Sequence, residues 1–373
     1  MENPILGGLT AQQFLAGYWQ KRPLLVRNAI PGFAGLLERD ALFSLARNEE
    51  VESRLVECPR EGWQMRHGPL RLRDLRPRRH PWTVLVQGLN LHLPEADRLL
   101  HRFDFIPHAR LDDVMVSYAT DGGSVGPHVD SYDVFLLQGS GKRRWRISGQ
   151  RDLDLVEAAP LKILRDFRPS KEWLLEAGDM LYLPPHYAHH GIAMGECTTY
   201  SIGFRAPSAQ ELMTHFLDWL RDQILIDGMY RDPDLKLQTH PAEISKAMLE
   251  QVQTMIAKLR WDEAMVRDFL GCYLTEPKAQ VYFETPQRRI SRARFITHSA
   301  KTGLRLDAGA RLLFTAGHFY LNGEAVKIGA VDRRAMRLLA DRRKLDNLSL
   351  LSEESVDLLY DWYLRGCCHL ATE

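Results

Sequence analysis

The stretch GPHVDSYDVF, residues 126–135, carries two side chains of types that bind metals. His128 and Asp130 lie two residues apart in a run that otherwise has the pattern of a buried strand. Residues i and i+2 of a strand point to the same face, so these two side chains and Tyr132 are expected to project together. Buried polar groups need partners. The pair therefore either hydrogen-bonds within the core or holds a metal ion.

A third ligand is available in LYLPPHYAHHG, residues 181–191, where a strand ends at two prolines and His186, His189 and His190 follow. Two histidines and one carboxylate on one face of a metal leave room for a bidentate cosubstrate and O2, an arrangement that suits non-haem Fe(II) oxygenases. Zinc more usually keeps three or four protein ligands. An HxD pair alone is a weak signal, and a later histidine at a strand end makes it more specific.

An arginine in GKRRWRI, residues 141–147, adds a second feature. Strand alternation places Arg143, Trp145 and Ile147 on one face, and the two apolar partners make that face the inner one. An unpaired guanidinium in a barrel core is costly and needs a carboxylate partner. A protein Asp or Glu can fill this role. A dicarboxylate ligand fills it better, because the guanidinium fork binds a carboxylate through two parallel hydrogen bonds.

The composition of the chain limits its class. The chain has 373 residues, which suits two or three domains, and a formal net charge of +1, so any basic surface is local. Five cysteines are scattered without a CxxC pair, which indicates neither a disulfide framework nor a thiolate zinc site. The first residues lack the pattern of a secretory leader, and no run of 18 apolar residues occurs. We therefore expect a cytoplasmic protein with no membrane partner.

Strand signals are dense between residues 81 and 205. Gly, Pro, Asp and Ser separate short apolar or alternating runs, which are WTVLVQGLNL, DDVMVSYAT, DVFLLQGSGKRRWRI, DMLYLPP and CTTYSIGFRAP. Short strands at this spacing predict an antiparallel sandwich or barrel. Upstream, residues 10–20 predict a helix with Thr10 as its N-cap, and residues 44–57 predict a helix that leads into a strand. The arginine-rich residues 60–80 are either a solvated face or a docking surface for an acidic or RNA-rich partner.

Helical periodicity follows the strand-rich region. Residues 208–229 and 242–272 predict amphipathic helices, which can serve as a packing element or as a dimer interface.

The last part of the chain predicts a third unit. Asn322-Gly323 lies between two strand-like runs, which is a strong hairpin signal, and helical patterns flank it at 332–343 and 353–365. Helices plus one hairpin in so short a segment resemble a winged-helix domain. Its arginines permit nucleic-acid binding, but we favour a structural or protein-contact role.

Taken together, the motifs resemble those of the JmjC-type 2-oxoglutarate oxygenases, and specifically the bacterial ribosomal oxygenases. GPHVDSYDVFLLQGSGKRRWRI, GDMLYLPPHYAHHG, YSIGFRAPS and the early YWQKRPLLVRN carry the resemblance, which covers the chain nearly end to end. It implies an α+β fold. Residues 1–206 are expected to form a double-stranded β-helix of the jelly-roll, cupin or JmjC type with an N-terminal α/β segment, residues 207–280 a helical dimerisation region, and residues 281–373 a winged-helix domain.

The resemblance also implies roles for individual residues. His128 and Asp130 match the family's HxD pair, and His189 matches its distal histidine, although His186 and His190 depart from the pattern and leave that assignment open. Arg143 matches the residue that holds the far carboxylate of 2-oxoglutarate, assisted by Ser117 in VMVSYAT. For the substrate, the candidates are Tyr132 and Asp121, and also Asp133, which strand alternation turns away from the metal.

An activity and partners follow from the same resemblance. Fe(II) and 2-oxoglutarate, with O2, would hydroxylate a substrate C–H bond. The substrate is expected to be a ribosomal protein of the large subunit, most specifically the β-carbon of an arginine in ribosomal protein sixteen. A homodimer is expected, and direct nucleic-acid binding is not.

Two other classes of protein compete with this interpretation. A cupin-type lyase or isomerase would usually place two histidines as HxH with a glutamate a few residues later. Here Asp130 takes the second position, no glutamate follows nearby, and an inward Arg143 has no role. A nucleic-acid-binding regulator with the barrel as a ligand sensor is permitted by the basic clusters. The near-neutral charge and the intact metal set argue against it.

Overall fold

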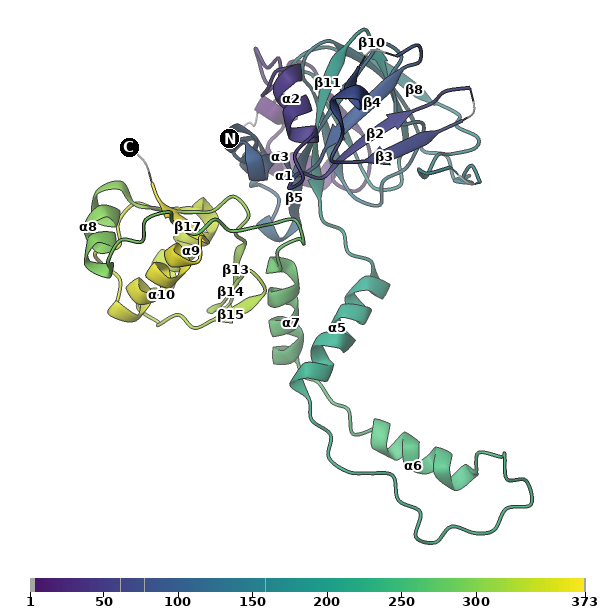
Figure 1. The fold of residues 1–373 in the computed structure, drawn as a ribbon, viewed down its shortest axis with the longest axis vertical. Coiled ribbons are helices and arrows are strands. Elements are labelled where there is room, and N and C mark those ends of the chain that lie inside the picture. The colour runs from purple at the N-terminus through teal and green to yellow at the C-terminus, as the bar shows by residue number, and fades with distance from the viewer. Residues whose placement is uncertain (1–3, 61, 77, 158, 372–373) are drawn as a thin grey trace.

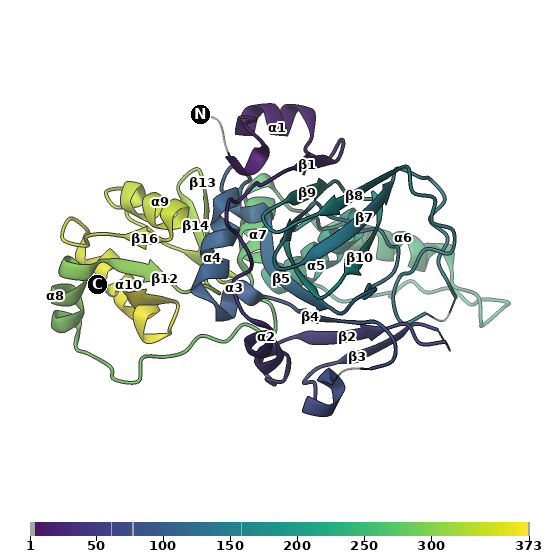
Figure 2. The ribbon, with the colours of Figure 1, turned by 90° about the horizontal axis from the view of Figure 1, so that it is seen from above.

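The computed structural model describes residues 4–60, 62–76, 78–157 and 159–371. Within them, the N-terminal half forms a barrel from two antiparallel sheets (Figures 1 and 2). The larger sheet has the strand order β1 (Leu24–Val26), β9 (Met180–Leu183), β6 (Val134–Gln138), β11 (Cys197–Phe204), β5 (Leu111–Ala119), β4 (Trp82–Val86), β2 (Ser53–Glu57) and β3 (Gln64–His67). The smaller sheet has the order β10 (Ala188–Met194), β7 (Lys142–Ser148) and β8 (Lys171–Leu175).

Burial along the strands follows their sequence patterns. Every residue of β6 is buried, as expected for a central strand between β9 and β11. In β7, Arg143, Trp145 and Ile147 are buried while Lys142 is exposed, so the predicted inner face is confirmed. The predicted barrel is therefore present.

Short helices cover the outside of the larger sheet and complete its main core. They are η1 (Pro4–Leu6), α1 (Ala11–Gly17), α2 (Arg39–Ala46), η2 (Leu72–Leu75), α3 (Leu89–His92), α4 (Pro94–Leu100), η3 (His101–Phe103) and η4 (His108–Arg110). Thr10 caps α1 through a capping box with Gln13, as predicted. Phe14 of α1 packs its ring against Phe135 and Tyr182 of the sheet.

Three local predictions were wrong. The helix predicted from residue 44 lies earlier, at α2, because the acidic run that follows has too few apolar side chains to pack. The strand predicted through Leu91 ends at Val86, where Gly88 takes the left-handed conformation and starts α3. Residues 127–133 form bends around one isolated bridge and are not part of a strand.

A helical arm follows the barrel and projects away from it (Figure 1). It consists of α5 (Ala209–Gln223), α6 (Lys246–Ile256) and α7 (Glu263–Thr275), so the second predicted helical range is divided into two helices. No helix within the described residues is both long and apolar enough to cross a membrane.

The C-terminal unit packs beside α7 around a core of its own. Its elements are α8 (Arg292–Thr302), β12 (Leu304–Leu306), β13 (Leu312–Thr315), β14 (His318–Leu321), β15 (Glu324–Val326), α9 (Arg333–Arg342), β16 (Lys344–Leu345), α10 (Glu353–Leu364) and β17 (Cys368–Leu370). Asn322 and Gly323 both have positive φ and join β14 to β15, so the predicted hairpin is confirmed. The boundaries predicted at 206/207 and 280/281 fall in segments without helix or strand, and as domain boundaries they stay a prediction.

Candidate metal centre and cosubstrate cavity

Three predicted ligands converge at one end of the barrel. Asp130 Oδ1 lies 3.9 Å from His128 Nε2, and Asp130 Oδ2 lies 3.6 Å from His189 Nε2. One ligand atom from each residue lies within 4.8 Å of the others. These separations exceed ordinary hydrogen-bond lengths. The three groups surround a space between them rather than bonding closely to one another, as a metal ion requires.

Each histidine is held through its other ring nitrogen. His128 Nδ1 lies 3.0 Å from the carbonyl oxygen of Gly126, and His189 Nδ1 lies 2.9 Å from that of Tyr187. A carbonyl oxygen only accepts hydrogen bonds, so each Nδ1 must carry the proton. Both Nε2 atoms therefore keep their lone pairs, and both face Asp130. This arrangement of an outer carbonyl behind each ring is typical of metal-binding histidines.

Backbone pairing between distant segments brings the ligands together. His128 and His189 form an isolated antiparallel bridge with N–O distances of 3.0 and 2.9 Å, and the His186 amide donates to the Asp130 carbonyl at 2.8 Å. Gly126 precedes the bridge with φ +81°, and a Cβ there would lie 2.5 Å from Ile163. The HxD pair thus reaches the site from a tight bend rather than from the strand that the sequence predicted.

The three histidines after the prolines occupy different environments. His189 is 2% exposed and faces the ligand cluster, and burial lowers its pKa to about 4, so its ring is neutral at pH 7. The side chain of His190, the next residue of β10, lies beside the Phe167 ring and near Arg146, away from the cluster. His186 is exposed with φ +60°. The geometry therefore brings His189, and neither neighbour, to Asp130.

Arg143 lies in the same cavity and lacks a carboxylate partner. Its side chain is 4% exposed, and its Nε and Nη2 atoms are buried without a hydrogen bond. Its Nη1 atom has a weak contact of 3.4 Å with the Ser117 hydroxyl. No Asp or Glu among the described residues forms an ion pair with it. Because a buried guanidinium needs an anion, these orphaned donors fit the far carboxylate of 2-oxoglutarate.

The cavity around these groups has a volume of about 430 Å³. Tyr132 lines it, together with Ser117, Thr199 and Ser201. Asp121 does not: its carboxylate accepts a hydrogen bond from the Gly195 amide at 2.7 Å, outside the cavity. Asp133 is fully buried and accepts a hydrogen bond from the Tyr182 hydroxyl at 2.6 Å, so it points away from the cluster of His128, Asp130 and His189, as expected, although residues 127–133 are not a strand.

Sequence reasoning missed other polar residues of the cavity wall. Asp112, Asp113 and Arg54 also line it, together with Trp145, which was expected on this inner face. Burial raises the pKa of Asp113, whose Oδ2 atom accepts hydrogen bonds from Gln87 Nε2 and the Gly88 amide. Trp145 Nε1 is a third buried donor without a hydrogen bond, after the Nε and Nη2 atoms of Arg143. The signal for the two aspartates was available, because an Asp-Asp pair opens the strand that carries Ser117.

Comparisons with known proteins agree with this site. The JmjC domain family matches residues 98–212, and the ROXA-like winged-helix family matches residues 258–369. A cupin-type barrel with two histidines, one carboxylate and a buried arginine around one cavity places the chain in the class of JmjC 2-oxoglutarate oxygenases. The predicted fold class, including the winged helix, is confirmed.

Relatives that match along nearly the whole chain narrow the class. The ribosomal protein uL16 3-hydroxylase of Escherichia coli (strain K12) is 33% identical over 359 residues, 93% of this chain and 92% of that protein. A probable ribosomal oxygenase of Haemophilus influenzae is 32% identical over 95% of this chain and 93% of its own. The X-ray structure of E. coli ycfD matches with a TM-score of 0.84 at 30% identity and covers 97% of this chain and 98% of that one. The chain belongs to the JmjC ribosomal oxygenase family.

A solved complex supports the fit of the cofactors. The structure of the E. coli ribosomal oxygenase YcfD with cobalt and 2-oxoglutarate matches with a TM-score of 0.81 at 30% identity, over 97% of this chain and 98% of that one. The present site has a donor set for a divalent metal and 2-oxoglutarate, because two imidazoles and a carboxylate suit Fe(II) and an unpaired buried guanidinium suits the dicarboxylate.

Proposed function

We propose that this protein hydroxylates a ribosomal protein of the large subunit with Fe(II), 2-oxoglutarate and O2. The observation that carries the proposal is the buried guanidinium of Arg143, with two donors unpaired, in the cavity that also holds the cluster of His128, Asp130 and His189. A metal cluster alone is common to many cupins. A metal cluster beside an unpaired inward arginine is what a bound dicarboxylate requires.

In this proposal each residue has one task. His128, Asp130 and His189 hold the iron. Arg143 binds the far carboxylate of 2-oxoglutarate through its fork, with the Ser117 hydroxyl beside it. Bound iron with its cosubstrate supplies the chemistry, which couples oxidative decarboxylation to hydroxylation of a C–H bond. The chain itself orients the cosubstrate and the substrate relative to the metal.

The finer substrate proposal is the β-carbon of an arginine in ribosomal protein uL16. It is supported by the end-to-end similarity to the E. coli uL16 3-hydroxylase. The ring of Tyr132 also lines the cavity, and an aromatic ring can pack against a cationic side chain. Tyr132 is 39% exposed, so its ring can contact both the cavity and an incoming peptide. A ribosomal substrate would place the protein in the cytoplasm.

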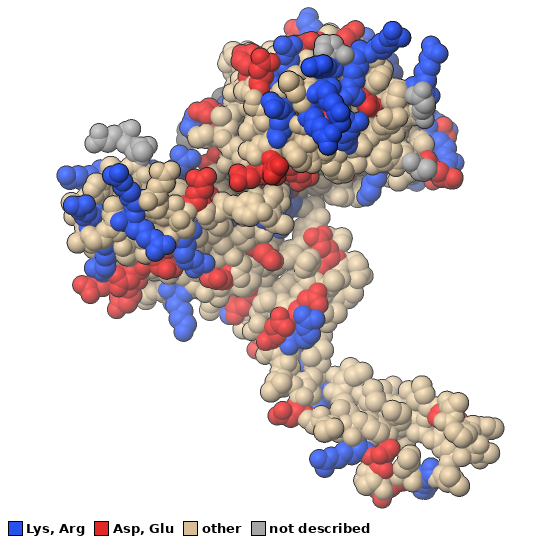
Figure 3. Space-filling model, viewed as in Figure 1, with Lys and Arg blue, Asp and Glu red and all other residues tan. Residues whose placement is uncertain are grey.

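A homodimer built on the helical arm is part of the proposal. Apolar side chains are exposed on each arm helix, including Met213 and Leu217 of α5, Leu249 and Ile256 of α6, and Leu270 of α7. Figure 3 shows that the arm surface has few charged side chains compared with the barrel, where lysines and arginines gather. Exposed apolar surface of this extent is typical of an interface. Direct binding of nucleic acid is not proposed.

The competing classes make different predictions for Arg143. A cupin lyase or isomerase has no need for an unpaired inward arginine, and a ligand sensor has no need for a complete set of metal ligands. Anaerobic addition of Fe(II) and 2-oxoglutarate should give a weak visible charge-transfer band. Its absence in the unaltered protein would contradict the oxygenase proposal.

Replacing Arg143 tests the cosubstrate site. Arg143→Ala should weaken 2-oxoglutarate binding by about 100-fold or more, because a charge-assisted bidentate pair is lost from a buried site. Metal content should stay unchanged, since Arg143 does not contact the metal ligands. Calorimetry with 2-oxoglutarate and elemental analysis measure the two effects. Arg144→Ala, on the outer face of β7, is the matched control. Equal 2-oxoglutarate affinity in the two variants would contradict the assignment.

Mass spectrometry of ribosomal proteins tests the substrate. Ribosomes from cells with and without the gene are compared, and we expect a mass difference of one oxygen atom on an arginine of uL16. Fragment ions should place the oxygen on the β-carbon. A change on another ribosomal protein would refute the uL16 assignment and keep the hydroxylase chemistry. No change on any ribosomal protein would refute the substrate class.

A further inference from the structure

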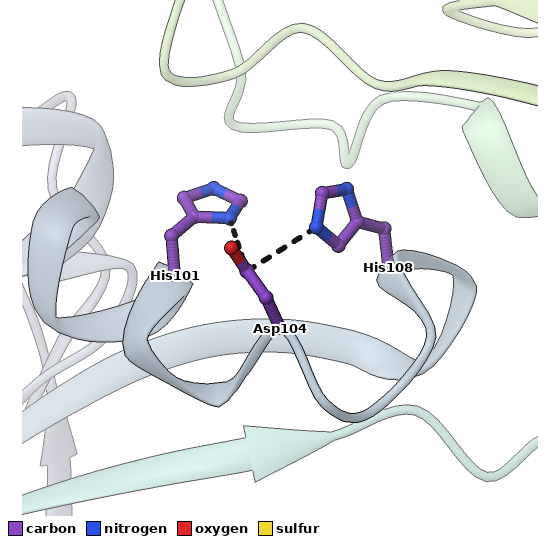
Figure 4. Close-up of side chains that lie close together, drawn as sticks. All are labelled: His101, Asp104 and His108. Atoms are coloured by element: carbon purple, nitrogen blue, oxygen red, sulfur yellow. Dashed lines mark hydrogen bonds and ion pairs between the residues drawn. The ribbon is translucent and has the colours of Figure 1, made fainter. Parts of the chain in front are cut away.

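A second group of two histidines and one carboxylate lies outside the barrel cavity. His101 starts η3, His108 starts η4, and Asp104 lies between them, so the three side chains converge (Figure 4). His101 Nδ1 and His108 Nε2 each lie 3.2 Å from the same atom, Asp104 Oδ1. Within the described residues, the proposed iron site is the other place where three such ligand atoms lie within 4.8 Å of one another.

The local sequence holds this geometry rigidly. In HRFDFIPH, residues 101–108, Phe103 and Ile106 are buried in the barrel core at 0% and 1% exposure. The Ile106 amide donates to the Phe103 carbonyl at 2.9 Å and closes the turn. The two anchors fix the polar residues between and beside them, and the rings of His101 and His108 lie edge to face with centroids 5.2 Å apart.

The distances within the cluster suit a metal as well as a hydrogen bond. Charge-assisted N–H···O bonds are about 2.7–2.9 Å long. Zn–N and Zn–O bonds of about 2.0–2.1 Å place neighbouring tetrahedral ligands about 3.3–3.4 Å apart. The two separations of 3.2 Å lie at the upper end of ordinary N–H···O hydrogen-bond lengths and close to the spacing of two ligands on one zinc ion. The side chain of Asp104 is 50% exposed, which leaves a fourth position open to water.

A buried carboxylate behind His101 is an independent observation that points to a ligand. His101 Nε2 lies 3.5 Å from Asp97 Oδ1, a buried oxygen without a hydrogen bond, one helical turn earlier in the chain. If Nε2–H faces this oxygen, the neutral ring keeps its lone pair on Nδ1, and two acceptors then meet at Asp104. A carboxylate behind a histidine in this way is the usual outer partner of a zinc ligand.

The cluster lies where the barrel meets the winged helix. His101 and His108 line a cavity of about 70 Å³ together with Arg311 and Arg343 of the C-terminal unit. Arg305 of β12 donates to Asp97 Oδ2 at 3.1 Å. An ion bound to His101 would therefore be connected through Asp97 to the winged-helix domain.

We propose that His101, Asp104 and His108 bind a divalent transition-metal ion of the Zn²⁺ class, and that this ion strengthens the junction between the barrel and the winged helix. Two imidazoles and one carboxylate are a donor set that zinc accepts, with water as the fourth ligand. This site is separate from the barrel centre and does not depend on the proposed hydroxylase function.

Metal counting with the full-length protein tests the proposal. After dialysis against Zn²⁺ and removal of the free ion, elemental analysis should give about two equivalents for the unaltered chain. About one equivalent of zinc should remain in the variant His128→Ala/Asp130→Ala, which lacks two ligands of the barrel centre. No zinc should remain when His108→Gln is added to that variant. Asp104→Asn should act as His108→Gln does. His67→Gln, an exposed histidine on β3, is the control and should change nothing.

A second measurement distinguishes loss of metal binding from misfolding of the variant. In the His128→Ala/Asp130→Ala background, Zn²⁺ should raise the unfolding temperature, and this rise should vanish with His108→Gln while circular dichroism stays unchanged. Binding of no metal in the His128→Ala/Asp130→Ala background would overturn the proposal. The cluster would then be a hydrogen-bonded group in which a protonated His101 bridges Asp97 and Asp104.

Discussion

Three histidines follow the prolines of LYLPPHYAHHG, and their surroundings give them different chemistry. His189 is buried with Nδ1 bound to the Tyr187 carbonyl and Nε2 directed at Asp130. Burial lowers the pKa of His190 to about 4 as well, but this ring faces Phe167. A low pKa therefore does not identify a ligand by itself. A ligand is identified by a ring nitrogen that keeps its lone pair and faces the other ligands.

Histidine replacement at this turn has an expected order of effects. His189→Ala should remove most bound Fe(II) and all 2-oxoglutarate turnover, because one of three ligands is lost. His190→Ala should keep stoichiometric metal and at least half of the turnover. Anaerobic Fe(II) titration and succinate formation measure both. His190→Ala losing as much metal as His189→Ala would contradict the assignment of the distal ligand.

At the scale of elements, the pairing of β7 with β10 shapes the cavity. Gly191 lies opposite Trp145 in this pair, and a Cβ at Gly191 would lie 2.7–2.9 Å from the indole ring. The same ring lies 5.8 Å from the imidazole of His189, between centroids. Glycine at this position therefore leaves the space in which the indole packs beside His189, the proposed distal metal ligand.

Adding a methyl group at Gly191 should disturb the cavity. Gly191→Ala should cost about 1–3 kcal/mol of unfolding free energy, which is typical of an overpacked core, and should weaken 2-oxoglutarate binding as Trp145 shifts toward Arg143. Urea denaturation and calorimetry measure the two effects. Gly149→Ala is the control, since its Cβ would meet no atom closer than 3.4 Å. Unchanged stability in Gly191→Ala would show that the indole has room to move.

The arm helices form locally and leave apolar faces uncovered. Ser208 caps α5 through a capping box with Glu211, and Ser245 and Asp262 cap α6 and α7. Caps of this kind favour the helices without a large core, and within α5 the one buried side chain is that of Leu220. Met213 and Leu217 lie four residues apart and share a face. We infer that a second copy covers this face.

Charge on that face should prevent dimerisation. Met213→Glu/Leu217→Glu should convert the protein to a monomer at micromolar concentration, because two carboxylates would have to be desolvated in the interface. Light scattering after size exclusion measures the mass. Thr214→Glu/Gln223→Glu adds the same charge at exposed polar positions of α5 and should keep the dimer. A monomeric unaltered protein would refute the dimer proposal.

At the scale of the whole molecule, Arg311 connects the winged helix to the barrel, in addition to the Arg305–Asp97 contact. Arg311 donates to the carbonyl oxygens of Leu111 and Asp112, at 3.2 and 3.0 Å. Burial lowers the pKa of Arg311 to about 10, which still leaves it charged at pH 7. Lys278, in the segment before α8, adds an ion pair of 2.8 Å to Asp112, a residue that borders the proposed cosubstrate cavity. The C-terminal unit thus supports one wall of the cavity.

Loss of this junction should separate the two units in unfolding. Arg311→Ala leaves buried carbonyl groups without donors, at a cost of about 1–3 kcal/mol each. Calorimetry should show an earlier transition for the winged helix and a separate one for the barrel. Arg334→Ala, exposed on α9, should melt as the unaltered protein does. A single unshifted transition in Arg311→Ala would contradict this role for the junction.

Much of the architecture is determined by local patterns. Alternation in GKRRWRI identified the inner face of β7, and Asn322-Gly323 identified the hairpin of the winged helix. These features depend on the conformational preferences of a few neighbouring residues, which the sequence contains directly. The strand predicted around His128 was wrong because contacts with a distant segment overrode the local pattern. Its local alternation was suitable, but Gly126 and a bridge to a distant segment produced a bend instead.

The sequence by itself determined which residue types were available, namely an HxD pair, a later group of histidines and an arginine on an inner strand face. The tertiary structure decided that His189 meets Asp130, that Arg143 has no carboxylate partner among the described residues, and that Asp121 lies outside the cavity. It also brought Asp112 and Asp113 into the cavity wall. The physical reason is that periodicity orients a side chain within its own strand, whereas pairing between distant segments, such as His128 with His189, decides which oriented side chains meet.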